Sequence, residues 1–223
     1  MMYEFVRDGL FHFVNACSDR QLRAIDAALD GVKQHEAGVR LYRIPSLGAP
    51  LDAEGCVGQF AARLIGAGAF PVRAILFDKG VAKNWALGWH QDRTVVVKMR
   101  ADVHGFDAWS VKAGLQHVAP PIEILNKMVT LRLHLDPVSK DNAPLEVAIG
   151  SHRLGRIAES DINDVVGNSQ IATCLAQRGD LWAYSTPILH ASAASLWPNR
   201  RRVLQVDYAA CDLPGGLEWL GIT

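Results

Sequence analysis

Two His-x-Asp triplets in the chain have the residue types and the spacing of metal ligands. They are His90-Gln91-Asp92 and His134-Leu135-Asp136. On a β-strand, side chains two residues apart point to the same face, so either triplet could offer an imidazole and a carboxylate to one ion. Either could equally be a salt-bridged pair at the mouth of a loop. Because the chain has eight histidines, such a triplet arises easily by chance, and neither is decisive by itself.

A further histidine and an arginine lie downstream, where they could supply a third metal ligand and a partner for a carboxylate. His190 follows the segment YSTPIL, and Arg201 comes at the predicted start of the next strand. Two histidines and one carboxylate on iron(II) leave three neighbouring positions open for a bidentate co-substrate and oxygen. Arginine offers a planar pair of donors to a carboxylate, so Arg201 could hold the far end of an oxo-diacid. The combination predicts an iron(II) oxygenase more specifically than any of its parts.

The elements that must position these residues are helices followed by short strands. Residues 18–21 have the form of a capping box, and apolar residues then recur at helical spacing, which predicts a helix over 19–33. A shorter helix could precede it, and CVGQFAARLIGAG predicts another. From residue 71 the predicted strands are VRAILFD, TVVVKM, MVTLRLHLD, LEVAI, IATCLA, LWAYS and RVLQVDYA. Such a series predicts an antiparallel sandwich or barrel backed by helices.

We expect a single domain over residues 1–223, with a helical part over 1–70 and a β core over about 71–210. Residues 101–127 have no strand period, which predicts a long irregular insertion. Such an insertion beside a site is often a lid or a substrate loop, and the sequence leaves open whether this one is. Lys98 and Trp109, at the edge of this segment and within it, could contact substrate. A solvated lysine and a core tryptophan are the more usual outcomes.

The composition narrows the choice of partners. The 23 basic and 23 acidic residues balance, so no nucleic-acid or anionic-membrane partner is expected. No apolar run reaches the ~18 residues of a membrane span. The four cysteines have no C-x-x-C spacing, which predicts reduced thiols in a cytoplasmic protein.

Three segments resemble, in order, motifs of the phytanoyl-CoA dioxygenase family of iron(II)/2-oxoglutarate oxygenases. They are WHQD, DNAPLEVAIGSHR over 141–153 and LHASAASLWPNRRRVLQVDY over 189–208, and the resemblance extends over about 72–208. It implies a mainly β fold with flanking helices, a double-stranded β-helix (a cupin-like jelly roll). It also implies a hydroxylase that uses Fe(II), 2-oxoglutarate and O2, and converts 2-oxoglutarate to succinate.

The resemblance carries over to individual residues. His90, Asp92 and His190 match the iron ligands, and Arg201 matches the arginine that pairs with the C5 carboxylate of 2-oxoglutarate. Because the family's halogenating members lack the carboxylate ligand, Asp92 favours hydroxylation. Three further positions are expected at the co-substrate: Gln91 beside the metal, and Ile75 and Arg132 lining the pocket. The family often has an aromatic residue where this chain has Arg132.

The second triplet lies in TLRLHLD, where leucines alternate with polar residues. If the leucines face the helices, Arg132 and His134 face the interior of the barrel. His134 is then either a pocket residue that contacts substrate or a histidine bonded to a neighbouring strand. Together with Lys98, these two basic groups suit a small-molecule substrate that carries a carboxylate.

Several smaller questions stay open in the sequence. Ser192 could bond a co-substrate carboxylate or only cap a strand end. Lys79, Asn84 and Trp85 could close over the co-substrate or only shape their loop. Two rival functions also remain: a cupin-like protein that uses another metal without 2-oxoglutarate, for which Arg201 would be dispensable, and a catalytically idle jelly roll that binds a small molecule or a protein.

Overall fold

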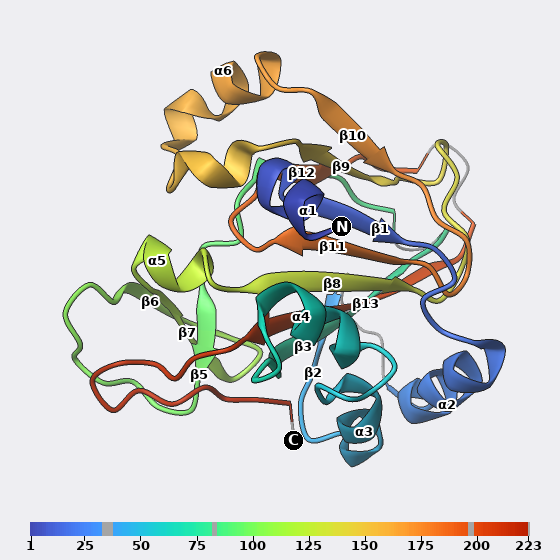
Figure 1. Ribbon diagram of the computed structural model, residues 1–223, viewed down its shortest axis with the longest axis horizontal. Helices are drawn as coiled ribbons and strands as arrows, with labels where there is room; N and C mark the ends of the chain where they lie inside the picture. Colours follow the sequence, from blue (N-terminus) through green and yellow to red (C-terminus); the bar gives the residue numbers. More distant parts are fainter. Residues whose placement is uncertain (33–37, 82–83, 196–198, 223) are drawn as a thin grey trace.

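The computed structural model describes residues 1–32, 38–81, 84–195 and 199–222, and two antiparallel sheets lie at its centre (Figure 1). In spatial order, the six-stranded sheet consists of β1 (Leu10–Phe13), β11 (Leu181–Ser185), β8 (Val129–His134), β13 (Arg201–Ala209), β3 (Phe70–Lys79) and β2 (Gly38–Leu41). The four-stranded sheet consists of β10 (Ile171–Cys174), β9 (Leu145–Ala148), β12 (His190–Ser192) and β4 (Leu87–His90). From β8 to β13 the chain crosses repeatedly between the sheets, which is the winding of a jelly roll. The predicted fold class is confirmed.

A third sheet contains much of the segment 101–127, for which an irregular insertion was expected. It has the order β5 (Val95–Val97), β7 (Leu115–Ala119), β6 (Asp107–Lys112), and the short helix α5 (Ile122–Leu125) follows it. Lys112 pairs with Leu115 across the two residues Ala113 and Gly114, whose φ angles are 50° and 77°. Two positive φ angles are what a tight hairpin turn requires. Residues 101–127 are therefore largely a packed hairpin and a helical turn, and the expectation of an irregular loop was wrong.

The helices lie mainly in the first third of the chain. They are α1 (Met2–Asp8), α2 (Asp19–Leu29), α3 (Gly48–Leu51), α4 (Gly58–Ile65) and, later, α6 (Ile162–Gly167), with 3₁₀ turns at Pro45–Leu47, Ser151–Leu154 and Glu159–Asp161. The capping box of α2 is present: the Ser18 N–H donates to Oε1 of Gln21 at 2.8 Å. The helix ends at Leu29, before the expected residue 33, which lies outside the described residues.

The expected helical part, residues 1–70, also contains strands. β1 and β2 come from it and form the two edges of the six-stranded sheet. All seven predicted strand segments are strands, namely β3, β5, β8, β9, β10, β11 and β13. The short strands β1, β2, β4, β6, β7 and β12 were not predicted.

The main hydrophobic core lies between the six-stranded sheet and helices α2 to α4 (Figure 1). Leu131, Leu133 and Leu135 are fully buried in this core, as expected from their spacing. Burying one leucine side chain contributes about 1.5–3 kcal/mol, so these residues determine which face of β8 turns to the helices. The alternate residues of β8, including Thr130 and Arg132, must then face the other sheet.

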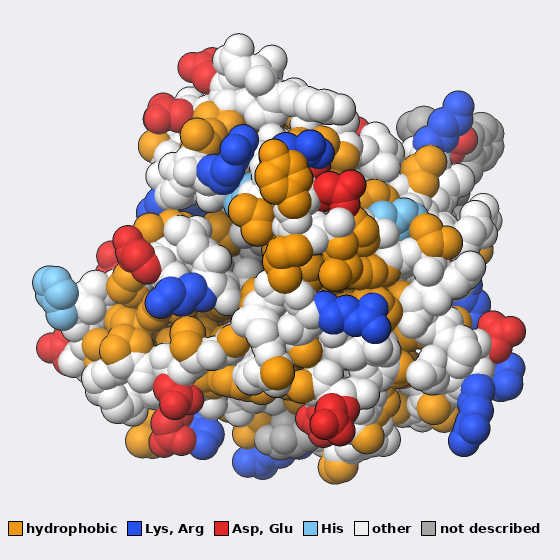
Figure 2. All heavy atoms as spheres, in the orientation of Figure 1, with side chains coloured by type: hydrophobic (Ala, Val, Ile, Leu, Met, Phe, Trp, Pro, Cys, Tyr) orange, Lys and Arg blue, Asp and Glu red, His pale blue; other side chains and the backbone are white. Residues whose placement is uncertain are grey.

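The register of the central strands brings polar residues together on this inner face. Arg201 is paired with Lys79, Gln205 with Ile75, and Asp207 with Arg73, while β8 places Arg132 beside Gln205 and Thr130 beside Asp207. The outer surface has a mixed character: on the face shown in Figure 2, acidic and basic side chains are interspersed. The charged residues gathered between the sheets therefore mark the candidate site.

Candidate metal centre

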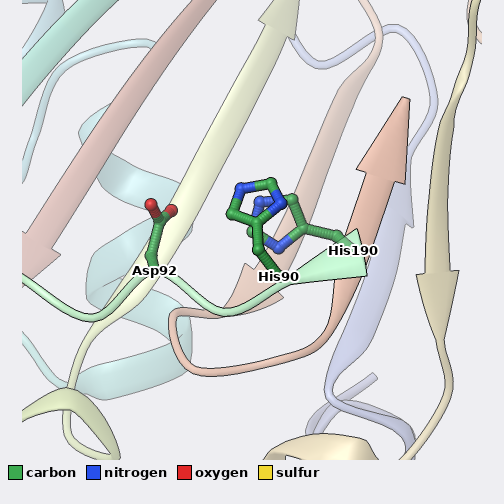
Figure 3. Close-up of side chains that lie close together, drawn as sticks. All are labelled: His90, Asp92 and His190. Carbon is green, nitrogen blue, oxygen red and sulfur yellow. The ribbon is translucent and has the colours of Figure 1, made fainter. Parts of the chain in front are cut away.

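Two paired strands of the four-stranded sheet bring the predicted ligands together. His90 ends β4, His190 begins β12, and the two residues are direct partners in the antiparallel pair. Asp92 follows two residues after His90. One ligand atom from each of the three lies within 4.8 Å of the others (Figure 3). In the part of the chain that the structure describes, this is the one group of three such residues.

The backbone orients both imidazoles for metal binding. Nδ1 of His90 lies 2.7 Å from the Gly88 carbonyl oxygen, and Nδ1 of His190 lies 3.0 Å from that of Ile188. A carbonyl only accepts, so each Nδ1 carries the hydrogen and each Nε2 is left with a free lone pair. Burial lowers the pKa of His190 to about 4, which keeps the ring neutral, the form that binds metals.

Asp92 provides the negative charge of the site. Burial alone would raise its pKa, but nearby positive charge, that of Arg73 foremost, lowers it below the usual value, which favours the ionised carboxylate. Its Oδ1 lies 3.5 Å from Nη2 of Arg73, whereas Oδ2 is buried without a hydrogen-bond partner among the described residues. An unpaired buried carboxylate oxygen is costly unless an ion binds it. The donor set therefore fits a divalent metal such as iron(II).

The second triplet does not form a comparable group. β8 ends at His134, and Asp136 instead accepts from the guanidinium of Arg202 at 2.9 and 2.8 Å. Arg202 adjoins Arg201 on β13 and points to the opposite face, because side chains alternate along a strand. Both ring nitrogens of His134 are buried without a hydrogen-bond partner in the described part of the chain, and burial lowers its pKa well below the usual value.

A cavity of about 110 Å³ adjoins the three candidate ligands and reaches Arg201. Among the described residues, three cationic groups line it, and Asp92 is the only carboxylate in the lining. It is lined by Ile75, Phe77, Lys79, Trp85, Leu87, His90, Asp92, Arg132, Leu145, His190, Ala191, Ser192, Arg201 and Gln205. The positive charge of this lining calls for an anionic ligand.

Arg201 has the strongest need for such a ligand. Its side chain is 2% exposed, Nη1 donates to the Ala143 carbonyl oxygen, and Nε has no partner among the described residues. Burial, with a smaller contribution from Arg132, lowers its pKa to about 9, so the guanidinium is still charged at neutral pH. A buried guanidinium is normally satisfied by a carboxylate. No protein carboxylate among the described residues forms an ion pair with Arg201.

Lys79 and Arg132 complete the cationic lining. Nζ of Lys79 donates to Oγ of Ser192 at 3.1 Å and to the carbonyl oxygens of Trp85 and Ala193. Arg132 donates from Nη1 to Oε1 of Gln205 at 2.6 Å and stacks over Phe77. Asn84 holds the loop instead: its side chain bonds the backbone of Ser195 at 2.8 and 2.6 Å.

The other predicted contacts divide into two groups. Ile75, Arg132 and Ser192 line the cavity with the ligands and Arg201. Lys98 and Trp109 lie elsewhere: Lys98 is exposed and pairs with Glu218 at 2.6 Å, and Trp109 packs in the core of the third sheet. His134 is not part of the cavity lining.

Gln91 points away from the cavity. Its amide group donates to the carbonyl oxygens of Gly155 and Pro187 and accepts from the N–H of Ile157, at 2.6 to 2.9 Å. The period of two that puts His90 and Asp92 on one face puts the residue between them on the other. This placement speaks against the expected contact with the co-substrate. Gln91 instead connects the backbone segments that contain Gly155, Ile157 and Pro187.

Sequence reasoning missed Arg73 and Asp207. The guanidinium of Arg73 contacts both Asp207 and the candidate ligand Asp92. The alternation in VRAILFDK and RRVLQVDY could have found them, because Arg73 shares a face with Ile75, and Asp207 with Arg201. The pairing between the two strands was needed to show that they meet.

The fold and the donor set define a class, jelly-roll proteins with a site for a divalent metal between the sheets. Residues 5–203 match a family profile described as Phytanoyl-CoA dioxygenase (PhyH). The match spans most of the chain, so the protein belongs to this family. No sequence among curated proteins matches it significantly. None of the described helices has the length and apolar character that crossing a bilayer requires.

Similar solved structures include EctD from S. alaskensis in its apoform, with 16% identity, a TM-score of 0.66, and coverage of 94% of this chain and 75% of that chain. SnoK, described as a non-heme alpha ketoglutarate dependent carbocyclase from nogalamycin biosynthesis, has 15% identity, a TM-score of 0.66, and coverage of 95% and 83%. HygX from Streptomyces hygroscopicus, with nickel and 2-oxoglutarate bound, has 12% identity, a TM-score of 0.62, and coverage of 93% and 85%. At these identities the likeness establishes a common fold.

Proposed function

We propose that the protein is a non-haem Fe(II)/2-oxoglutarate-dependent dioxygenase that hydroxylates a small-molecule substrate and converts 2-oxoglutarate to succinate. The observation that carries the proposal is the buried Arg201 guanidinium, which has no carboxylate partner among the described residues and lies in one cavity with the His90, Asp92 and His190 donors. Membership of the family and the 2-oxoglutarate bound to HygX support the same function.

In this proposal the chain holds each reactant by a different group. His90, Asp92 and His190 bind iron(II), which when bound supplies the oxidising chemistry with 2-oxoglutarate and O2. Arg201 binds the C5 carboxylate of 2-oxoglutarate. Ser192 and Lys79 lie at the same end of the cavity and donate hydrogen bonds to this carboxylate. Ile75 and Phe77 provide the apolar wall along the carbon chain and limit access of water.

Arg132 is the one cationic residue of the described lining that this proposal has not assigned to the C5 carboxylate, so it can bind a second carboxylate. Its Nη1 has a neutral partner, Gln205, and its Nε has none in the described part of the chain. It therefore binds either the metal-proximal carboxylate of 2-oxoglutarate or a carboxylate of the substrate. We favour a carboxylate-bearing small molecule as substrate, without the contribution first expected from Lys98. The predicted cytoplasmic location rests on the cysteine spacing alone.

Arg201 also separates this proposal from its rivals. A cupin-like protein that does not use 2-oxoglutarate, or an idle binding protein, would have no need of a buried arginine that faces the metal donors. Hydrogen bonds to a charged group contribute about 1.5–3 kcal/mol, and 1.4 kcal/mol corresponds to tenfold in affinity. Arg201→Gln should therefore weaken 2-oxoglutarate binding by about 10- to 100-fold.

The experiment is calorimetric titration of 2-oxoglutarate into the anaerobic Fe(II)-loaded protein. Arg200→Gln provides a matched control, because Arg200 is the neighbouring arginine, exposed and paired with Asp78. We expect a loss of affinity in Arg201→Gln and none in Arg200→Gln. Absence of 2-oxoglutarate binding by the wild-type protein, or equal affinity in all three proteins, would contradict the proposed function.

A further inference from the structure

We propose that Arg73, anchored by Asp207, positions the carboxylate of Asp92 so that one of its oxygens remains free for the metal. The inference rests on the proposed role of Asp92 as a metal ligand and adds a positioning residue that acts through it. It concerns an arginine that has no part in binding 2-oxoglutarate.

Three adjacent strands place Thr130, Asp207 and Arg73 side by side. Thr130 on β8 is the direct partner of Asp207 on β13, and Asp207 is the direct partner of Arg73 on β3. The pairing of β13 with β3 shifts register immediately after Asp207. Such irregularities occur beside active sites, where they change the direction of a side chain.

Arg73 uses different sides of its guanidinium for its two aspartates. Nε donates to Oδ2 of Asp207, whereas Nη2 lies 3.5 Å from Oδ1 of Asp92. The anchoring contact is thus the closer of the two. The planar, rigid fork of arginine allows one side chain to fix the direction between two carboxylates, which a lysine cannot do.

The two aspartates differ in what their second oxygen does. Oδ1 of Asp207 accepts from the Thr130 hydroxyl at 3.0 Å, and that hydroxyl is 3.2 Å from the hydroxyl of Thr186. Both oxygens of Asp207 are thus satisfied by the protein. Oδ2 of Asp92 is buried and has no partner among the described residues. Arg73 therefore orients Asp92 through one oxygen, while the other can bind a cation.

Asp207 also keeps Arg73 from neutralising Asp92 completely. A guanidinium with a single carboxylate partner tends to form a two-pronged pair, which would occupy both oxygens of Asp92. Since Asp207 holds Nε of Arg73, the side-on pair through Nε and Nη2 is not available to Asp92. Arg73 and Asp207 are 10% and 3% exposed, so solvent screens this arrangement little.

Two variants test the positioning role. Arg73→Lys keeps the charge and removes the fork. The double variant Arg73→Gln with Asp207→Asn removes both charges and leaves the net charge unchanged; losing both members of a buried pair is tolerated better than losing one. Co(II) is the probe, added anaerobically without 2-oxoglutarate. Loss of the groups that orient a metal ligand costs about 10- to 100-fold in metal affinity, and we expect a loss of this size in both variants.

Arg202→Lys is the matched control. Arg202 also bridges two aspartates, Asp136 and Asp26, and it lies on β13 outside the cavity. All proteins are also unfolded in urea without metal, which measures the contribution of each arginine to stability. We expect Arg202→Lys to lower stability and to leave Co(II) affinity unchanged.

The proposal is overturned if the double variant folds and binds Co(II) as tightly as the wild-type protein, or if Arg202→Lys weakens binding equally. If Arg73→Lys does not fold, the Co(II) affinity of the double variant alone tests the positioning role. Wild-type protein that binds Co(II), but not 2-oxoglutarate in the Fe(II) form, contradicts the proposed function and leaves the positioning role to be judged by the Co(II) affinities. Wild-type protein that does not bind Co(II) contradicts both.

Discussion

Lys79 brings a charge that titrates near neutral pH into the cavity. Burial, and then Arg201 and Arg132, lower its pKa to about 7. In the ligand-free protein the cost of burying the charged ammonium is present below pH 7, and it is relieved as the folded protein releases the proton. The unfolded chain then binds more protons, so the contribution of Lys79 to stability rises from pH 7 towards its ordinary pKa of 10.5.

Co-substrate binding should have the opposite pH dependence, because 2-oxoglutarate is a dianion and prefers the protonated lysine. The KM for 2-oxoglutarate should rise as the pH increases through about 7. Lys79→Met should weaken this dependence, whereas Lys112→Met, at an exposed position of β6, should not. The measurement is the KM well below and well above this pH. An unchanged profile in Lys79→Met would contradict the assignment.

Among individual residues, the sequence predicted those whose chemistry is visible in their type and spacing. The structure brings His90, Asp92 and His190 together and places Arg201 in the same cavity. The pairing of Arg73 with Asp207 could not be predicted, because it depends on the register between two strands far apart in the chain. For Gln91, the resemblance suggested a contact that the alternation of strand side chains argues against.

β8 shows how an apolar pattern on one face of a strand orients chemistry on the other. Leu131, Leu133 and Leu135 pack against the helices, which turns Thr130 and Arg132 towards the four-stranded sheet. β13 is oriented in the same way, because its Leu204 and Val206 pack in the core against the helices. The elements that position the cavity are therefore stabilised by contacts that do not touch it.

Leu133→Ala should lower the free energy of unfolding by about 2–5 kcal/mol, because it leaves a cavity at a fully buried position. The KM for 2-oxoglutarate of the folded variant should be unchanged. The measurement is urea unfolding of the metal-free protein. Leu175→Ala, at a position 45% exposed, is the control and should cost no more than about 0.5 kcal/mol. Equal losses in the two variants would contradict this account of β8.

Secondary structure was predictable where a segment has clear alternation or an apolar run, even in short strands such as β5, β9 and β10, and several strands without such a pattern were missed. β3, β8 and β13 have six or more residues with clear alternation or buried apolar runs. β4 and β12 have four and three residues, and they are strands because they pair with each other through His90 and His190. The β6–β7 hairpin was missed because its turn, Ala113-Gly114, includes a non-glycine residue with positive φ.

The whole molecule separates the candidate metal donors and the cationic residues between its two larger sheets. The histidine donors lie on the four-stranded sheet, with Asp92 just after β4, and the cationic residues Lys79, Arg132 and Arg201 lie on the six-stranded sheet. The site is therefore assembled only when the sheets pack face to face. The metal and the 2-oxoglutarate dianion would then connect the four-stranded sheet to the six-stranded sheet.

The most direct test of this account is anaerobic addition of Fe(II) and 2-oxoglutarate to the protein, followed by visible absorption. Chelation of 2-oxoglutarate to iron gives a weak charge-transfer band. The account predicts this band in the wild-type protein and in His134→Ala, and its loss in His90→Ala. No band in the wild-type protein, or a band lost in His134→Ala and kept in His90→Ala, would contradict it.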